Sequence, residues 1–376
     1  MQKKIHIVSF QNPCPPTYGG VIDVYYKLFS LKKAGYYVVL HSFCYKERMK
    51  KNDALLEIAD EVYLYHRNES IITQFSYIPY IVNSRRDKRL KQNLLQDEAP
   101  ILFEGLHSCF FLSDLDFANR LKIVRTHNIE HDYYWNLCKA TKKIKEKLFF
   151  SIEALRLKGY ERVLRYADYI ATITDKDKEY FSEKYPDINT FLLPCFYNDA
   201  KLEQLPGEGN YVLCHGNLSV QENVKALMWI MENIIPLLPN VNFVFAGSNP
   251  ERSLKTKCKE YDNIQLVENP TQEEMDKLLI GAHVHLLVTF QATEIKLKLL
   301  NSLCRGAFVV ANSKMTQGTG LEAYCYVANT PKEIANLIYR AMSEEFTEEM
   351  YKNRKILENH CSIKPLLKIL EDNQNN

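Results

Sequence analysis

Residues 289–312 read TFQATEIKLKLLNSLCRGAFVVAN, a polar loop followed by a helical pattern and an apolar run. Apolar residues recur at helical spacing between positions 299 and 304, which predicts a helix that starts near Thr293. Gly306 then ends the turn, and residues 307–311 are apolar and numerous enough for a buried strand. We interpret the stretch as a phosphate site.

Two lysines in the first turn of this helix indicate the kind of ligand. A helix start presents unpaired backbone N–H groups and the positive end of the helix dipole, so an anion can bind there. Because the same dipole disfavours cations, Lys296 and Lys298 suggest a negatively charged ligand that more than compensates them. A solvated basic face without a ligand would show the same two lysines, and the residues alone leave both explanations open.

The segment 293–301, TEIKLKLLN, followed by SLCRG and the apolar strand, resembles the nucleotide-sugar signature of glycosyltransferase family 4. Many members carry two glutamates eight positions apart, and here Thr293 and Asn301 stand in those places. The form with a lysine pair and a final asparagine resembles a recognisable branch of the family. The resemblance implies a catalytic role for Lys296 and a ribose contact for Asn301. The donor-binding residues that it implies here are Thr293, Glu294, Lys296, Lys298 and Asn301.

Length and composition indicate an ordinary globular protein of about two or three domains. The chain has 376 residues, of which 46% are hydrophobic and 25% charged, and its formal net charge is only +2. This balance gives no electrostatic argument for nucleic acid, so we expect no such partner. The ten cysteines are scattered without a C-x-x-C pair, which implies neither a zinc site nor a disulfide framework.

The sequence shows neither a targeting signal nor a membrane span. The N-terminus MQKKIHIVSF has two lysines but only a short apolar run. No apolar run approaches the roughly 20 residues that a transmembrane helix needs. We therefore expect a cytoplasmic protein, either in solution or at the inner face of the membrane.

The chain opens with a strand, loop, helix and strand. Residues 5–10 and 38–43 have strand patterns and residues 21–34 have helical spacing, which predicts a parallel, doubly wound α/β sheet. Gly19 and Gly20 lie where the helix begins and let a ligand approach the backbone, unless they serve only as a turn. The family resemblance implies that this loop faces the donor phosphates. Because the loop is not G-x-G-x-x-G, an ordinary dinucleotide-binding dehydrogenase is disfavoured.

Two further strand patterns, at 101–105 and 122–128, end in polar residues, where ligand groups collect in open α/β sheets. The second continues as RTHNIEH over 125–131, which closely resembles the HN-x-E segment of the same family. The resemblance implies that His127 lines the cleft near the transferred sugar and takes part in catalysis. From the residues alone, a histidine at a strand end is more often structural.

Residues 139–165 form a basic helical region with nine Lys or Arg against three Glu. The apolar side that we expect for this region consists of Leu148, Phe149, Phe150, Ile152 and Leu155. Such a surface suits a peripheral contact with anionic lipid or a lipid-phosphate acceptor. A solvated helix face packed on the sheet is the commoner explanation.

The second half of the chain repeats the strand, loop and helix order. A strand from residue 211 leads through Gly216 and Asn217 toward a helix over 223–235. We predict an N-terminal Rossmann-like acceptor-side domain over 1–195, a C-terminal Rossmann-like nucleotide-sugar domain over 210–350, and a helical segment over 351–376 that returns to the first domain. Two such domains facing across a cleft are the GT-B fold. His283 and His285 lack a third ligand nearby, so we expect structural roles for them.

In many family members the loop at Gly216 supplies an Arg and a Lys to the diphosphate. This chain has Asn217 there and, near the other place, Glu222 and Asn223. The lysine pair of residues 296 and 298 must then carry more of the charge. By the resemblance, Gly19, Gly20, Gly216 and Asn217 complete the donor-binding set.

The resemblance implies a retaining transfer of a sugar from a nucleotide-diphosphate donor to a glycan or lipid-linked acceptor, in surface polysaccharide or glycoconjugate synthesis. Lys296, together with Lys298 and the helix start, would stabilise the charge that develops on the diphosphate, so we expect neither a metal nor another cofactor. A nucleotide-sugar 2-epimerase and a non-catalytic donor-binding or scaffold subunit remain alternatives. The HN-x-E and KLKLLN segments favour transfer.

Overall fold

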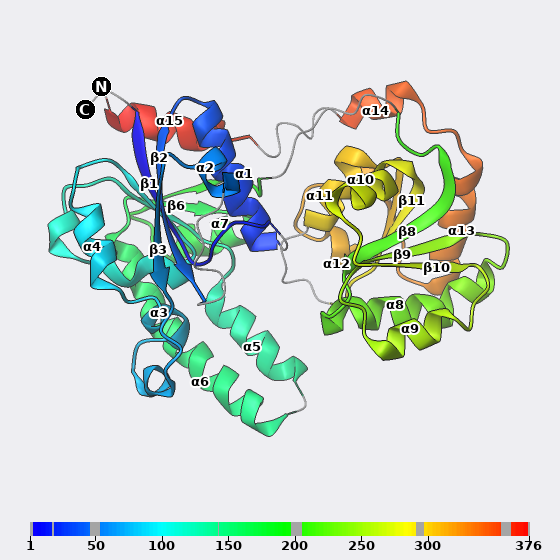
Figure 1. Ribbon diagram of the computed structural model, residues 1–376, viewed down its shortest axis with the longest axis horizontal. Helices are drawn as coiled ribbons and strands as arrows, with labels where there is room; N and C mark the ends of the chain where they lie inside the picture. The colour runs from blue at the N-terminus through cyan, green and yellow to red at the C-terminus, as the bar shows by residue number, and fades with distance from the viewer. Residues whose placement is uncertain are drawn as a thin grey trace. The chain divides into compact units, whose positions relative to one another are not determined.

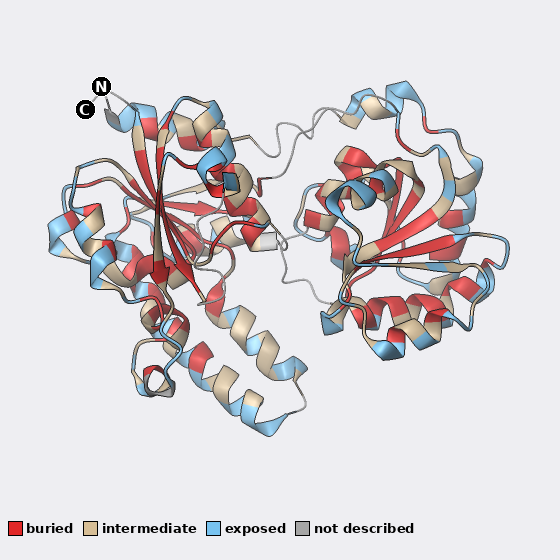
Figure 2. Cartoon of the chain, in the orientation of Figure 1, coloured by how far each residue is buried: buried red, intermediate tan, exposed pale blue. Residues whose placement is uncertain are grey.

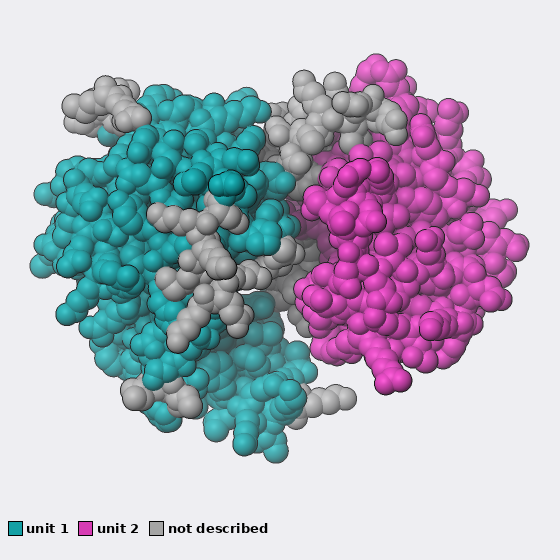
Figure 3. Space-filling view, in the orientation of Figure 1, with its two compact units in different colours: residues 1–196, 361–376 teal, residues 197–360 magenta. Residues whose placement is uncertain are grey.

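The computed structural model describes residues 3–16, 19–45, 53–141, 143–196, 205–290, 297–354 and 362–374. The chain divides into two compact units, which Figure 3 shows in different colours. Unit 1 contains residues 1–196 and 361–376, and unit 2 contains residues 197–360. Each unit is built around its own parallel sheet, with helices packed against it (Figure 1).

Unit 1 contains a seven-stranded sheet with the order β3-β2-β1-β4-β5-β6-β7, and every pairing is parallel. Its strands are β1 (Lys4–Ser9), β2 (Tyr37–Cys44), β3 (Glu61–His66), β4 (Ile101–Glu104), β5 (Lys122–Arg125), β6 (Tyr169–Thr172) and β7 (Asn189–Leu192). Its α-helices are α1 (Gly19–Lys33), α2 (Asp53–Ile58), α3 (Tyr80–Asn83), α4 (Lys88–Leu94), α5 (Glu130–Ala140), α6 (Ile144–Tyr160), α7 (Asp175–Lys184) and α15 (Lys364–Gln374). Its 3-10 helices are η2 (Ile71–Phe75), η3 (Leu106–Phe111), η4 (Leu115–Phe117) and η5 (Glu161–Tyr166).

The central strands of unit 1 are apolar because both of their faces are covered. Ile5 and Ile7 of β1 pack in one apolar cluster, whereas Val8 packs in another. Successive side chains of a strand point to opposite faces of its sheet, so the two clusters lie on opposite faces. Figure 2 shows these strands as buried, which explains why they read as continuous apolar runs in the sequence.

Unit 2 contains a six-stranded parallel sheet with the order β10-β9-β8-β11-β12-β13. Its strands are β8 (Gly209–Asn217), β9 (Phe243–Ser248), β10 (Ile264–Glu268), β11 (Ala282–Leu287), β12 (Phe308–Ala311) and β13 (Tyr326–Val327). Its α-helices are α8 (Gln221–Asn233), α9 (Arg252–Cys258), α10 (Gln272–Gly281), α11 (Leu297–Arg305), α12 (Ser313–Thr316), α13 (Pro331–Ser343) and α14 (Glu348–Arg354), with the 3-10 helices η6 (Ile235–Leu237) and η7 (Glu322–Tyr324). Val212 and Leu213 of β8 pack in different clusters, so this sheet is also covered on both faces.

The two sheets confirm the predicted pair of Rossmann-like folds. In each sheet the first strand along the chain lies centrally, and the strand order reverses beside it, between β1 and β4 in unit 1 and between β8 and β11 in unit 2. Ligands of open α/β sheets bind outside the carboxyl ends of the strands at such a reversal. Both candidate sites are therefore expected at the loops that follow these four strands.

The last described helix, α15, belongs to unit 1, whereas α14 belongs to unit 2. Leu366 and Leu370 of α15 are fully buried in the cluster that also holds Ile5 and Ile7. Lys3 forms an ion pair of 2.8 Å with Glu371 at the surface. The end of the chain thus covers one face of the sheet formed by its beginning. None of the described helices is long and apolar enough to cross a bilayer.

We expect Leu370→Ala to destabilise unit 1 by about 2–5 kcal/mol, because it removes a fully buried side chain and leaves a cavity beneath α15. Urea unfolding followed by circular dichroism measures this loss. Lys368→Ala, an exposed position on the same helix, should change stability by less than about 0.5 kcal/mol. Equal stabilities of the two variants would contradict the docking of α15.

Candidate functional site

Four charged side chains meet inside unit 1, near the carboxyl ends of β4 and β5. Asp23 and Lys27 lie one turn apart on α1. Glu104 ends β4 and Arg125 ends β5. The Lys27 ammonium lies 2.6 Å from Glu104 Oε1 and 3.1 Å from Asp23 Oδ2, and Arg125 Nη2 donates to both Asp23 oxygens at 3.2 and 3.3 Å. All four are at most 1% exposed, so two cations and two carboxylates balance one another away from water.

This network also holds the last residues of unit 1 before the connection to unit 2. Arg125 donates to the carbonyl oxygen of Leu193 and, at 3.2 Å, to that of Pro194. The backbone N–H of Phe196 donates to Asp23 Oδ1 at 2.6 Å. The same buried charges therefore fix α1, two strands and the end of the unit.

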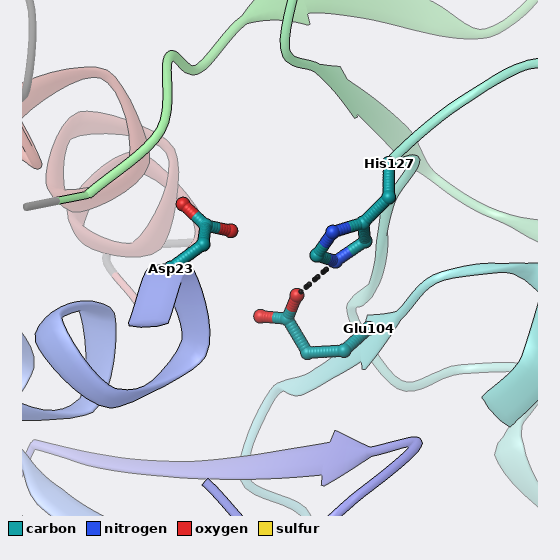
Figure 4. Close-up of side chains that lie close together, drawn as sticks. All are labelled: Asp23, Glu104 and His127. Carbon is teal, nitrogen blue, oxygen red and sulfur yellow. Dashed lines mark hydrogen bonds and ion pairs between the residues drawn. The ribbon is translucent and has the colours of Figure 1, made fainter. Parts of the chain in front are cut away.

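His127 lies two residues beyond β5 and joins the network through Glu104. Its Nε2 lies 2.9 Å from Glu104 Oε2, as Figure 4 shows. Because an ionised carboxylate only accepts hydrogen bonds, Nε2 donates and the orientation of the ring is fixed. A Cβ atom added to Gly20 would lie 3.9 Å from His127 Nδ1 and 3.1 Å from the ring of Phe10. The structure thus brings Gly20, at the start of α1, next to the other ring nitrogen of His127.

The carboxylates of the network stay ionised despite their burial. Burial alone would raise the pKa of Asp23, but Arg125 and then Lys27 outweigh it and lower this pKa below its ordinary value. Burial is likewise outweighed at Glu104, whose pKa is lowered by Lys27 and by the hydrogen bond with His127. Both groups therefore serve as fixed negative charges rather than as acids.

Asp23, Glu104 and His127 also offer the residue types of a metal site. One potential ligand atom from each lies within 4.8 Å of the others (Figure 4). The Lys27 ammonium already contacts both carboxylates and compensates their charge, together with Arg125. A metal ion would have to displace that ammonium, so the arrangement fits an internal ion pair better than a metal centre.

A second buried pair follows the same strands. Glu130, the last residue of the HN-x-E segment and the first of α5, is 3% exposed. Its Oε1 makes no hydrogen bond with the described residues and lies 3.8 Å from His107 Nδ1. Burial raises the pKa of Glu130 to about 8, with Glu161 and Asp177 adding to the rise and Arg85 opposing it. Burial, with Arg85 nearby, lowers the pKa of His107 well below its usual value, so both groups are mainly neutral at pH 7.

In unit 2, Lys298 of α11 reaches the loop that follows β8. Its Nζ donates to Asn223 Oδ1 at 2.5 Å, and Asn223 Nδ2 donates to the carbonyl oxygen of Asn217 at 2.9 Å. Gly216 has a φ of +155°, and a Cβ added there would lie 3.4 Å from Lys298 Nζ. The structure thus gathers Gly216, Asn217 and Lys298 at the carboxyl end of β8, at the expected edge of the sheet.

Glu222 and Asn223 stand near one of the two places where the resemblance implied a cation, and the structure shows their contacts. Glu222 Oε1 accepts from Thr289 Oγ1 at 2.9 Å and from the N–H of Phe290 at 2.7 Å. Asn312 Nδ2 donates to the carbonyl oxygen of Thr289 at 2.7 Å. Glu222 therefore fastens the chain that leads toward α11, while Asn223 orients Lys298.

The remaining predicted residues are placed as follows. Thr293, Glu294 and Lys296, and with them the predicted start of the helix, lie outside the described residues. Asn301 is half-buried on α11, and Gly19 is the first residue of α1. His283 and His285 have structural contacts, because their ring nitrogens bond backbone carbonyls, among them those of Gly207 and Leu279.

Comparison with known proteins finds a family match within unit 2. Residues 209–344 match the model of a family described as Glycosyl transferases group 1. These residues of unit 2 are thus similar to a group 1 glycosyltransferase domain. This match confirms the resemblance to glycosyltransferase family 4 that the segment 293–301 suggested.

The similarity to solved structures extends over nearly the whole chain and shows the GT-B fold. Sucrose-phosphate synthase from Thermosynechococcus elongatus superposes with a TM-score of 0.68 at 15% identity, and the match covers 99% of this chain and 98% of that one. TarM gives a TM-score of 0.67 at 11% identity with the same coverage. An uncharacterized 44.6 kDa protein in the cps region of Klebsiella pneumoniae is 28% identical over 336 residues, which is 84% of each chain.

The sequence did not single out Asp23, Lys27, Glu104 or Arg125 as site residues. Glu104 and Arg125 were visible at the polar ends of two strand patterns. Asp23 and Lys27 interrupt the apolar face of a helix at a spacing of four residues, which is the spacing of an intrahelical ion pair. The sequence signal for the ion network was therefore this pair of opposite charges, Asp23 and Lys27, on the apolar face of the helix.

Glu130→Gln tests the protonation of the buried acid. Because the pKa of Glu130 is higher in the folded chain, protonation stabilises the fold; this stabilisation is complete below about pH 4.5 and is lost as the pH rises through about 8. We expect the wild-type protein to lose stability relative to Glu130→Gln over that range, by on the order of a few kcal/mol. Urea unfolding at several pH values measures the difference. Glu179→Gln, at an exposed position of α7, is the control, and a pH-independent difference for Glu130→Gln would refute the assignment.

Proposed function

We propose that this protein is a retaining, metal-independent glycosyltransferase that moves a sugar from a nucleotide-diphosphate donor to a glycan or lipid-linked acceptor. The observation that carries the proposal is the Lys298 ammonium, held by Asn223 against the Gly216 loop of a group 1 glycosyltransferase domain. A fixed cation beside a glycine suits a diphosphate, because a residue without a side chain lets an anion approach the main chain.

Positive charges of the protein would stabilise the diphosphate leaving group of the donor. As the bond between sugar and diphosphate breaks, negative charge develops on the leaving group, and a cation placed beforehand stabilises it without reorganisation. Lys298 would supply one such cation and Lys296 another, and Asn301 would bond the ribose. Thr293 and Glu294 complete the proposed donor contacts.

His127 would contact the transferred sugar of the donor. Glu104 fixes its ring, so that Nδ1 is presented toward Gly20 and the start of α1. A histidine oriented in this way can hydrogen-bond a sugar hydroxyl through Nδ1 without changing its own position. We therefore assign it a role in turnover rather than in nucleotide binding.

The same geometry disfavours the epimerase alternative. An epimerase needs carboxylates and histidines that exchange protons with the substrate. Asp23 and Glu104 are buried, ionised and bound to Lys27 and Arg125, so they suit positioning better than proton transfer. For the same reason, neither carboxylate suits the role of a nucleophile.

Two relatives support the choice of substrates and pathway. The structure of Trehalose-6-phosphate from E. coli bound with UDP-2-fluoro glucose has a TM-score of 0.62 at 13% identity, which supports a nucleotide sugar as the donor. The relative from Klebsiella pneumoniae lies in a cps region, which supports a role in surface polysaccharide synthesis. Incubation with a panel of nucleotide sugars, scored by release of the nucleotide diphosphate, tests the activity. Donor binding without release or transfer would favour the scaffold alternative.

Lys298→Ala should weaken binding of the nucleotide diphosphate by about 10- to 100-fold, because it removes one charged hydrogen-bond partner of the phosphates. Isothermal titration calorimetry with the nucleotide diphosphate measures this change. Lys277→Ala removes an exposed lysine elsewhere in unit 2 and should leave the affinity unaltered. An unchanged affinity of Lys298→Ala would reject the proposed donor site. We expect Lys296→Ala to lose both donor affinity and transfer.

His127→Ala should lower turnover on the order of a hundredfold while the donor affinity stays nearly constant, since the inferred place of His127 is beside the sugar. Steady-state kinetics on the donor identified by the panel, together with calorimetry on the same sample, separates the two effects. A large loss of nucleotide affinity with normal turnover at saturation would contradict the role given to His127.

A further inference from the structure

Helices α5 and α6 form a hairpin that extends away from the sheet of unit 1 (Figure 1). Aromatic contacts hold its inner side: Phe150 of α6 packs edge-on against Tyr134 of α5, with ring centroids 6.0 Å apart, and Phe149 packs against Tyr80, at 6.3 Å. These contacts correct the expected apolar side of the region, because they turn Phe149 and Phe150 inward.

The outer face of α6 carries four apolar side chains that unit 1 leaves uncovered. This apolar stripe consists of Ile144, Leu148, Ile152 and Leu155, which are 84%, 62%, 40% and 67% exposed. Their spacing of four, four and three residues places them within about 80° of the helix circumference. Single exposed leucines are common on protein surfaces, but a continuous apolar row marks a surface that is covered in use.

Exposed lysines border the apolar stripe on both sides. At about 100° per residue, Lys145 lies at one edge of the stripe, and Lys147 and Lys158 lie at the other. None of the three forms an ion pair with a described residue. Long lysine side chains at the edge of an apolar face can extend their ammonium groups toward lipid phosphates while the stripe is buried.

The acidic residues of α6 do not offset these lysines at the surface. Glu153 is fully buried and accepts hydrogen bonds from Arg156 and from the N–H of Tyr80. Glu146 is bound by Lys143 and by the hydroxyl of Thr141. The exposed charge along the stripe is therefore positive.

Two exposed aromatic side chains lie beside α6. Phe75 and Tyr77, which are 82% and 88% exposed, follow Gln74, whose carbonyl oxygen accepts a 2.8 Å hydrogen bond from Arg156 of α6. Aromatic rings with one apolar and one polar end are favoured at the boundary between lipid and water. Tyr77 is such a residue, and Phe75 adds a second exposed ring near α6.

We propose that the apolar stripe and its bordering lysines are a docking surface for an anionic membrane leaflet. The helix α6 would lie in the plane of the lipid headgroups, with the stripe inserted between acyl chains and the lysines on phosphates. This inference goes beyond sugar transfer and does not depend on it, because it rests on the surface of α6 alone.

The charge pattern favours a membrane over a second copy of the chain. A symmetric dimer through the stripe would bring the same patch of both copies together, so that Lys145, Lys147 and Lys158 would face their own counterparts. Like charges that meet across an interface oppose association, whereas anionic lipids complement them.

Cosedimentation with sucrose-loaded vesicles tests the proposal on the full chain. At low salt, we expect the wild-type protein to pellet with vesicles of phosphatidylcholine and phosphatidylglycerol and to remain in the supernatant with phosphatidylcholine alone. Rising salt should weaken the binding, because exposed charges are screened over about 8 Å at physiological ionic strength. Equal recovery with both kinds of vesicle would overturn the proposal.

Two variants separate the contributions of the surface. The triple change Ile144→Ser, Leu148→Ser and Leu155→Ser should reduce partitioning at least about tenfold even at low salt. The triple change Lys145→Glu, Lys147→Glu and Lys158→Glu should reduce it on the order of a hundredfold or more, because each adjacent lysine contributes about fivefold. Each variant has a matched triple control at exposed positions outside the hairpin. The control for the serine variant combines Leu56→Ser, Leu95→Ser and Leu115→Ser. The control for the glutamate variant combines Lys33→Glu, Lys88→Glu and Lys176→Glu.

The control variants should bind vesicles as the wild-type protein does, and all variants should keep the thermal shift given by a bound nucleotide diphosphate. Normal vesicle binding by the stripe variant would refute the docking surface.

Sedimentation velocity tests whether a second copy covers this face instead. That outcome requires that the wild-type protein is a dimer, that the stripe variant is a monomer, and that neither binds vesicles. Loss of the nucleotide response in the wild-type protein, with vesicle binding intact, would count against the proposed transfer and leave this surface standing.

Discussion

The ion network of Asp23, Lys27, Glu104 and Arg125 is the constraint on which unit 1 depends. Its four side chains are buried and their charges sum to zero, so each member is tolerated only while the others stay in place. Removing one partner of such a group leaves a buried charge uncompensated, which typically costs about 3–5 kcal/mol. Since the members come from α1, β4 and β5, the network joins one helix to two strands of the sheet. Glu104, held by this network, in turn fixes the ring of His127 through a hydrogen bond.

Unit 2 orders its candidate site by a different kind of interaction. Glu222 accepts from the side chain of Thr289 and from the backbone of Phe290, and Asn223 accepts from Lys298. Among the described residues, these contacts join the first turn of α8 to the chain after β11 and to α11, at separations of 67, 68 and 75 residues. Near a place where the resemblance implied a cation, the start of α8 thus carries two acceptors, and Asn223 holds the Lys298 ammonium near Gly216.

The sequence predicted the parts of this structure that local patterns encode. Apolar runs and glycines indicated both sheets, because strands covered on two faces are continuously apolar. The ion network was beyond such patterns: Lys27 and Glu104 are 77 residues apart, and Asp23 and Arg125 are 102 apart. No periodicity connects residues at that separation, and only the order of strands brings them together. A role for His127 could be predicted from the sequence only because a family motif contains this residue.

The basic hairpin shows why a charge count and a surface charge differ. The near-neutral net charge of +2 suggests no attraction to anionic surfaces, and even the local count includes three glutamates against nine cations. Folding places Glu153 and Glu161 in the interior, where each is bound by a cation, and leaves Lys145 and Lys147 at the surface. Acidic side chains that are buried and paired contribute little field outside the protein, so the hairpin presents more positive charge than its composition implies.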